Sequence, residues 1–370
     1  MSVKALLRLT SLMFGSLFMG PLMAQHEGHD HAQATHAQAH VASGTAGHAP
    51  AAEKFNAGKL IMDHIGDEHG WHLWGHTSLP LPVILYDTQR GLQVFSSARF
   101  DHGHATHGGY ALVDHKVVAV DAHGQLDEAA TKRIWDISIT KNVLSLFISL
   151  AIILLVFISV ARAYSRRVGQ APTGLQNLVE PIILFVRDDV AKSAIGHKYE
   201  KYMPYLLTAF FFIFLNNLMG LVPFFPGGAN LTGNIAVTLV LALITFVIVT
   251  VNGNKHYWGH ILAMPGVPAW VLAILTPVEV LGMFLKPFVL MIRLFANITA
   301  GHIIALSFFS LIFVFGETNA GAGYGVSIMS LAFTVFMTML ELLVAFIQAY
   351  VFTFLSAMYI GAAVEEPQHH

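Results

Sequence analysis

Residues 288–302 read FVLMIRLFANITAGH, and they lie within an apolar segment, 270–315, that is too long for one upright membrane helix. The segment 326–363 has the same character, and such lengths suit strongly tilted helices. Three shorter segments approach the roughly 20 apolar residues of a membrane helix: 142–160, 202–222 and 234–251. We therefore predict an all-α polytopic membrane protein, in which one upright helix precedes a transmembrane hairpin and two long tilted helices.

The composition also indicates a membrane protein. Hydrophobic residues make up 55% of the 370-residue chain and charged residues only 11%, with a mean hydropathy of +0.61, whereas soluble domains carry about 25% charged residues. The net charge of −2 gives no indication of a nucleic-acid partner. The chain has no cysteine, which excludes disulfides, thiolate nucleophiles and thiolate metal sites.

The N-terminal 130 residues differ from the rest of the chain. Residues 1–24 resemble a signal peptide, because Lys4 and Arg8 precede an apolar stretch, 9–23, with Ala24 at a plausible cleavage site; a retained anchor helix is the alternative. Residues 25–57 are rich in His, Ala and Gly and predict a disordered exported tail, although such a tract can also bind metal. Residues 58–130 contain LPLPVILY, GLQVFSS and YALVDHKVVAV, which predict a small exported β-rich region.

Basic residues predict the orientation of the chain. Seven Lys or Arg side chains lie between residues 162 and 201, whereas the turns 223–233 and 316–325 contain none. Because cytoplasmic loops carry the excess of positive charge, five crossings place the N-terminal region outside and the C-terminus inside. Residues 173–195 are moderately amphipathic, so we expect a helix that lies on the membrane surface.

Ionisable side chains in the last two apolar segments are the strongest functional indication, since each central charge costs roughly 2.5–3.5 kcal/mol in a bilayer. Glu279, Lys286 and Arg293 are spaced by seven residues and share one helical stripe. Asn297 lies one turn beyond Arg293. Arg293 cannot release its proton, so it is a permanent cation that requires a counter-charge. That counter-charge is either Glu279 or Glu341 of this chain, or a carboxylate on a partner that arrives and leaves.

His302 and Glu341 can carry protons, because a histidine both donates and accepts near neutral pH and a carboxyl group titrates. If the last two segments pack antiparallel, these two side chains can meet and form part of a polar path through the bilayer. Gln348, seven residues after Glu341, lies on the same helical face. His302 or Glu341 alone could equally be a buried polar residue whose hydrogen bonds are all made within the chain. The presence of a cation at position 293 favours the interpretation that they form a proton path.

Five stretches together resemble the ATP synthase subunit a family, the membrane stator subunit of the F0 sector. The most specific is RLFANITAGH at 293–302, which resembles the family's hallmark around its essential arginine. The others are WDISITKNVLSLFISL at 135–150, NNLMGLVPFFPGGANLTGNIAVTLVLAL at 216–243, TPVEVLGMFLKPFVLMIRLF at 276–295 and ELLVAFIQAYVF at 341–352. The resemblance covers residues 135–364, which we take as the membrane domain.

The resemblance implies a function and a set of site residues. It implies a proton-translocating stator subunit of a rotary F-type ATP synthase, with two offset half-channels and an essential cation, Arg293, that faces the carboxylates of the c-ring. Asn297 matches the polar residue one turn away, and Gln348 matches a glutamine near the arginine. His302 and Glu341 match the pair of the outer half-channel. Glu279 matches an acid earlier on the same helix.

The resemblance further implies the surroundings of the chain. Its partners would be the c-ring, the b-subunit peripheral stalk, other F0F1 subunits and the lipid bilayer. It would be a multi-pass protein of the bacterial inner membrane, with a periplasmic N-terminal region and a cytoplasmic C-terminus. No cofactor is implied, and protons are expected as the coupling ion rather than Na⁺. The chain would not be an enzyme by itself, and it has no GxxxxGK[ST] phosphate loop. Two departures are Ala296, where the family usually has Gly, and the exported region 25–130.

Three other functions fit the sequence less well. A secondary cation/proton transporter often has internal repeats around a midplane site, and the sequence shows no two-fold repeat. A metal-handling membrane protein would carry His or Met ligands deep in its helices, where His302 has no ligand neighbours. A membrane enzyme is the weakest alternative, since the sequence has no HExxH or GxSxG pattern.

Overall fold

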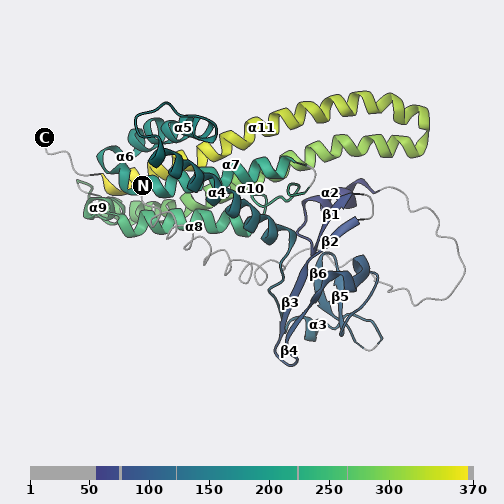
Figure 1. Cartoon of the computed structure of the whole chain (residues 1–370). Helices are drawn as coiled ribbons and strands as arrows, with labels where there is room; N and C mark the ends of the chain where they lie inside the picture. Colours follow the sequence, from purple (N-terminus) through teal and green to yellow (C-terminus); the bar gives the residue numbers. More distant parts are fainter. Residues whose placement is uncertain (1–55, 75–76, 122, 223–224, 265, 366–370) are drawn as a thin grey trace, which may run out of the picture.

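The fold has two parts, a long helical body and a small β-rich region near one end of it (Figure 1). The structure is a computed structural model, and it describes residues 56–365 apart from 75–76, 122, 223–224 and 265. The predicted signal peptide, 1–24, lies outside the described residues. So does the predicted His-rich tail, 25–57, except for its last two residues.

The β-rich region begins with a helix that the sequence did not predict, α2 (Ala57–Ile65). The described strands are β1 (Gly70–Trp74), β2 (Thr77–Pro80), β3 (Pro82–Asp87), β4 (Gly91–Ser96), β5 (Tyr110–Val113), β6 (Lys116–Ala119) and β7 (Ile134–Asp136). The three segments with predicted strand character form β2 to β6. β1 pairs with β2 and β5 with β6, while β4, β3 and β7 form an antiparallel sheet in that order. β7 extends the region past its predicted end at residue 130, because Trp135 pairs with Tyr86 on β3.

Alternation along β3 builds the core of this region. Val83 and Leu85 point inward and are fully buried, whereas Tyr86 points outward. They pack with Phe100, from the 3-10 helix η1 (Ser97–Gly103), and with Tyr110 on β5. A short helix, α3 (Glu128–Thr131), leads into β7. The region therefore has a small core of its own, separate from the core of the helical body.

The first membrane helix, α4 (Lys141–Arg166), is capped by Thr140, whose hydroxyl accepts a hydrogen bond from the Val143 amide at 3.4 Å. The helix runs past its predicted end at residue 160. The physical reason is that 161–166, ARAYSR, contains neither Gly nor Pro, so nothing in these residues stops the helix where the hydrophobicity falls.

The predicted surface helix consists of α5 (Leu175–Phe185) and a π-helical stretch, η2 (Val186–Lys192). Its amphipathic character is confirmed: Val186 and Val190 are fully buried, while Arg187 and Lys192 both bind Asp188 on the exposed side. The buried face packs against α7 and α11. Its position at the membrane surface stays a prediction. The chain then passes through α6 (Ser193–Ile195) and η3 (Gly196–Lys198).

The predicted hairpin consists of α7 (Tyr199–Leu221) and α8 (Ile235–Asn252). The polar connection after α8 contains a short helix that the sequence did not predict, α9 (Lys255–Leu262). It begins where the Asn254 side chain accepts a hydrogen bond from the Tyr257 amide at 2.7 Å.

The two long predicted segments are two continuous helices, α10 (Ala269–Thr318, 50 residues) and α11 (Ala320–Val364, 45 residues). They form an antiparallel hairpin that turns at Asn319, whose side chain accepts a hydrogen bond from the Gly321 amide at 2.8 Å. At 1.5 Å per residue, α10 is about 75 Å long, more than twice the roughly 30 Å hydrocarbon core. Such a helix cannot stand upright within a bilayer along its whole length.

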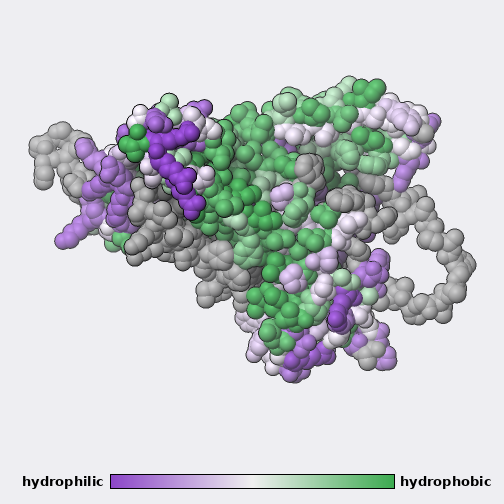
Figure 2. All heavy atoms as spheres, in the orientation of Figure 1, coloured by the Kyte–Doolittle hydropathy of each residue, from purple (hydrophilic) through white to green (hydrophobic). Residues whose placement is uncertain are grey.

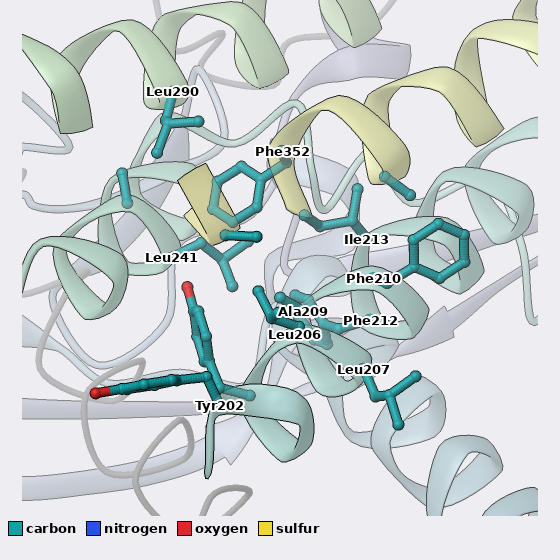
Figure 3. Packing of buried hydrophobic residues seen from close by; sticks show 14 of the residues in the cluster. Tyr202, Leu206, Leu207, Ala209, Phe210, Phe212, Ile213, Leu241, Leu290 and Phe352 are labelled. Carbon is teal, nitrogen blue, oxygen red and sulfur yellow. The ribbon is translucent and has the colours of Figure 1, made fainter. Parts of the chain in front are cut away.

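A core of large apolar side chains holds the helical body together. Figure 3 shows Phe210, Phe212 and Ile213 of α7 packed near Leu241 of α8 and Phe352 of α11. All five are at most 3% exposed. Because close-packed interiors resist displacement, α7 gives the other helices a rigid central support.

The described residues contain five helical segments that are long and apolar enough to cross a membrane, as predicted. These are Lys141–Arg166, Leu175–Leu221, Ile235–Asn252, Ala269–Thr318 and Gly323–Val364. Figure 2 shows hydrophobic side chains over the middle of the helical body and hydrophilic ones gathered toward its ends. The β-rich region and the α10–α11 turn lie at one end, and the last turns of α11 lie at the other (Figure 1). The chain is thus a mostly helical, multi-pass membrane protein.

Candidate functional site

Contacts between α10 and α11 fix how the two helices are aligned. The Lys286 ammonium lies 5.5 Å from the Tyr359 ring centroid, and the rings of Phe308 and Phe333 stack with centroids 5.0 Å apart. Between these two contacts, His302 meets Glu341. The antiparallel alignment that the sequence left conditional is therefore present over at least six turns of α10.

His302 and Glu341 form the central pair of the site. His302 Nδ1 and Glu341 Oε1 are 4.0 Å apart, and the two side chains are only 12% and 13% exposed. The predicted meeting of these residues is confirmed. Glu341 Oε1 is buried and accepts no hydrogen bond from any described residue. Such an oxygen is costly as an ion, so this carboxyl group is well suited to hold a proton.

Two glycines make room for the pair. A Cβ atom on Gly301 would lie 2.8 Å from Glu341 Oε1, and one on Gly220 of α7 would lie 3.6 Å from His302 Nε2. Gly301 therefore lets the Glu341 carboxyl group lie directly against the backbone of α10. Neither glycine was predicted to be part of the site, although Gly301 lies inside the RLFANITAGH stretch.

Arg293 and Asn297 are exposed on α10, one turn apart. No carboxylate among the described residues lies within 4.0 Å of the Arg293 guanidinium. Glu341 instead faces His302, and Glu279 is 14 residues earlier, about 21 Å along the helix axis. The described part of the chain therefore contains no ion pair between Arg293 and either Glu279 or Glu341.

Gln348 and Glu279 occupy different places relative to Arg293. Gln348 is 7% exposed on α11, and the alignment of the helices puts it opposite the turn 293–297 of α10. Glu279 lies near the start of α10, where Thr276 Oγ1 donates a hydrogen bond to the Leu262 carbonyl at 3.0 Å and joins α10 to α9. The structure thus brings Gln348 to the level of Arg293 and leaves Glu279 apart.

A polar cluster from the α7–α8 hairpin, which was not predicted, lies one turn from Glu341. Asn217 Nδ2 donates a hydrogen bond to the Ala345 carbonyl at 3.1 Å, and Thr232 Oγ1 donates one to Asn217 Oδ1 at 2.6 Å. Asn217 and Thr232 are almost fully buried. The signal in the sequence was the run of Asn and Thr residues within 216–234, an unusually polar composition for a hairpin at membrane depth.

A further histidine reaches the site from outside the helical body. His64, near the end of α2, has its ring centroid 6.4 Å from that of His302. α2 packs against α10, and Figure 1 shows it beside the part of α10 that leads to the turn. No sequence signal identified His64, because it belongs to an unpredicted helix that is separated from His302 by more than 200 residues.

Comparisons with known proteins found related sequences for both parts of the chain. The family model described as ATP synthase A chain matches residues 143–361, and a domain of unknown function, DUF8433, matches residues 60–137. ATP synthase subunit a of Chloroherpeton thalassium is 45% identical over 64% of this chain and 69% of its own length. ATP synthase subunit a 2 of Chlorobaculum tepidum is 47% identical over 64% of this chain and 66% of its own. ATP synthase subunit a of Myxococcus xanthus is 43% identical over 64% and 76%.

The family match covers the described membrane helices from the start of α4 almost to the end of α11, including all six predicted site residues. The N-terminal match ends at residue 137, just before α4 begins. Since the family model covers more than half of the chain, the chain belongs to the ATP synthase A chain family.

Proposed function

We propose that this chain is the proton-translocating stator subunit of a rotary F-type ATP synthase, with Arg293 as the fixed cation that meets each c-ring carboxylate in turn. The observation that carries the proposal is the exposed guanidinium of Arg293, which has no carboxylate partner in the described part of the chain. A charge at membrane depth is costly, and a counter-charge on a moving neighbour offsets that cost. The chain would itself be a non-catalytic membrane subunit.

The pair His302 and Glu341 would form the outer half-channel. A proton that enters from outside passes through this pair and neutralises a ring carboxylate. The neutral carboxyl group enters the lipid at far lower cost than the ion, so the ring can rotate. Side-chain rotation or a bridging water molecule would close the 4.0 Å separation between the two groups during transfer.

The inner half-channel would lie on the other side of Arg293. A small pocket between α8, α9, α10 and α11 is lined by Lys286, Tyr257 and Tyr359 among others. Lys286 is about 10 Å before Arg293 along α10, and His302 is about 13 Å after it. This offset supports two half-channels separated by a cation, which would attract the ring carboxylate and block direct leakage. Glu279, earlier on α10, would belong to the inner path.

The c-ring would lie against the exposed face of α10 beside Arg293. Ala296 and Ala300 are exposed on this face, and their small side chains allow a neighbouring helix to approach closely. Ala296 replaces the glycine that the family usually has, and it preserves this close approach. The b-subunit peripheral stalk and the other F0F1 subunits would complete the complex.

The orientation proposed for the chain follows from its charges. The Lys and Arg residues between positions 162 and 201 would lie in the cytoplasm with the C-terminus, and the β-rich region would lie in the periplasm. The coupling ion would be the proton rather than Na⁺, since His302 and Glu341 together suit proton exchange.

Cross-linking in the assembled complex tests this proposal. Because the chain has no cysteine, a single Ala296→Cys variant provides a unique thiol beside Arg293. We expect it to cross-link to a ring subunit that carries a cysteine next to its carboxylate. Leu290→Cys is the control, since Leu290 is 1% exposed and faces the core. Failure of Ala296→Cys to cross-link in an active complex would refute the assignment of this face to the ring.

A further inference from the structure

The end of α2 is clamped against the start of α4, at the outer end of the site. Lys141 Nζ donates a hydrogen bond to the His64 carbonyl at 3.3 Å, and the Lys141 amide donates one to the Glu68 carbonyl at 2.8 Å. The Asp67 carboxylate accepts hydrogen bonds from the Thr140 hydroxyl at 2.9 Å and from the Asn142 amide at 3.0 Å. These bonds hold the backbone of residues 64–68 against the start of α4, and so they place the Cα atom that carries the His64 ring.

The hydrogen bonds between residues 64–68 and the start of α4 place a second histidine, His64, near the pair formed by His302 and Glu341. The His64 ring centroid lies 6.4 Å from that of His302, with the ring planes tilted by 54°. One water molecule or a small ring rotation spans such a separation. His302 in turn lies beside Glu341, so His64, His302 and Glu341 form a row from the β-rich region into the helical body.

The charged and titratable groups around His64 come from three directions. Lys141 approaches from α4, Asp67 and Glu68 follow in the same loop, and His302 with Glu341 lies on α10 and α11. Burial, and then the charge of Lys141, hold the pKa of His64 below its ordinary value. Burial raises the pKa of Asp67, although its hydrogen bonds to Asn142 and Thr140 oppose that shift. A histidine in these surroundings stays neutral between transfers, so one ring nitrogen can accept a proton while the other releases one.

A second titratable pair, Glu68 and His115, lies at the partly exposed side of the β-rich region. The Glu68 carboxylate lies 3.8 Å from His115 Nδ1, and both side chains are partly exposed, at 25% and 33%. Glu68 follows His64 by four residues, so the loop that carries the clamp also carries a partly exposed acid. Through Glu68, this second pair of titratable groups thus lies four residues after His64 in the sequence, at the partly exposed side of the β-rich region.

We propose that His64 is a proton-relay residue that precedes His302 on the proton path, so that the β-rich region supplies the outer entrance of the half-channel. This rests on the proposed function, and it assigns a role to a region outside the family's membrane domain. In each transfer His64 accepts a proton on one ring nitrogen and passes another to His302, directly or through water. The proton count is conserved, and no bond other than N–H and O–H bonds forms or breaks.

Proton-driven ATP synthesis by the complete complex in vesicles tests the relay. With His64→Ala we expect the rate to fall by about tenfold, less than the roughly hundredfold or greater effect of a positioned acid–base group, because water still reaches His302. The loss should grow as the outside pH rises and protons become scarce. His104→Ala is the matched control, since His104 is an exposed histidine of the same region, and it should leave the rate unchanged.

Rescue separates a relay from a structural role. Added imidazole, or the titratable substitution His64→Glu, should restore most of the rate, whereas His64→Gln should not. A wild-type rate in His64→Ala at every pH would overturn the relay, and so would a loss that neither imidazole nor His64→Glu restores. Arg293→Ala serves as the reference. If it abolishes synthesis while His64→Ala does not slow it, only the relay fails; if Arg293→Ala is also normal, the proposed function fails.

Discussion

His302 of α10 and Glu341 of α11 face each other across the long helical hairpin, with Nδ1 and Oε1 4.0 Å apart. The two residues are 39 positions apart in the sequence, so only the antiparallel packing of α10 and α11 brings them together. Gly301 lets Glu341 lie against the α10 backbone, and the adjacent residue, His302, presents its ring to the same carboxyl group. The proposed proton path would thus depend on helix packing as much as on the titrating groups themselves.

Glu341→Gln should slow proton flux at least about a hundredfold, because the substitution removes a positioned proton carrier. Assembly should be kept, since Glu341 Oε1 has no hydrogen-bond donor among the described residues that the amide would lose. Flux is measured with a pH-sensitive dye in vesicles that contain the complex. Glu317→Gln, at the exposed end of α10, is the control and should behave as the wild type. Unchanged flux in Glu341→Gln would exclude this residue from the path.

Arg293→Ala should abolish proton-driven ATP synthesis while the subunit still assembles. The substitution leaves no buried carboxylate unpaired, because no described carboxylate lies within ion-pair distance of Arg293. ATP synthesis and the amount of subunit in the purified complex are measured together. Arg162→Ala, an exposed residue in the last turns of α4, is the control for the loss of a positive charge. Normal synthesis in Arg293→Ala would refute its role as the ring-facing cation.

The membrane architecture could be predicted because hydrophobicity and length determine it. Five apolar segments, two of them very long, follow from the sequence pattern alone, and the structure contains all five. The predicted helix boundaries were less accurate. α4 continues for six residues past its apolar stretch, because residues 161–166 are no longer apolar but still favour a helix. The helix α9 was missed because it is short and lies in a polar segment.

The site was predictable where its residues share a helix and less so where packing joins distant segments. Arg293, Asn297 and His302 belong to one stretch of α10, and their spacing was readable. Asn217, Gly220 and His64 join the site through tertiary contacts across 80 residues or more, which no local pattern encodes. Glu279 lies on the same helical stripe as Arg293, but it is 14 residues earlier on α10 and therefore far from the Arg293 side chain.

The acid stability of the β-rich region should depend on Asp136. Burial alone would raise the pKa of this carboxyl group, but the hydrogen bond from His69 at 2.9 Å and those from Ser138 outweigh it, so the pKa lies below its ordinary value. A lowered folded-state pKa means that the stabilisation is present above the unfolded value of 3.8 and is lost as the pH falls through the folded value.

Asp136→Asn should therefore destabilise the region by about 1–3 kcal/mol at neutral pH and flatten its stability profile in acid. Limited proteolysis of residues 57–136 within the solubilised chain, followed against pH, measures both effects. Asp114→Asn, an exposed turn residue, is the control. An unchanged acid profile in Asp136→Asn would show that the His69–Asp136 pair does not set the acid limit.

Gly301→Ala tests whether close packing at the proton pair is required. The added Cβ would lie 2.8 Å from Glu341 Oε1 and 3.3 Å from its Cγ, so the carboxyl group has to move away from His302. We expect flux to fall about as far as in Glu341→Gln. The shorter acid in a Gly301→Ala, Glu341→Asp double variant relieves the clash and should recover part of that flux. Gly282→Ala is the matched control on the same helix, because its Cβ would meet nothing within 4 Å. Since both single glycine variants favour the helix equally, a loss confined to Gly301→Ala must come from the displaced carboxyl group, and equal flux in the two would contradict the packing argument.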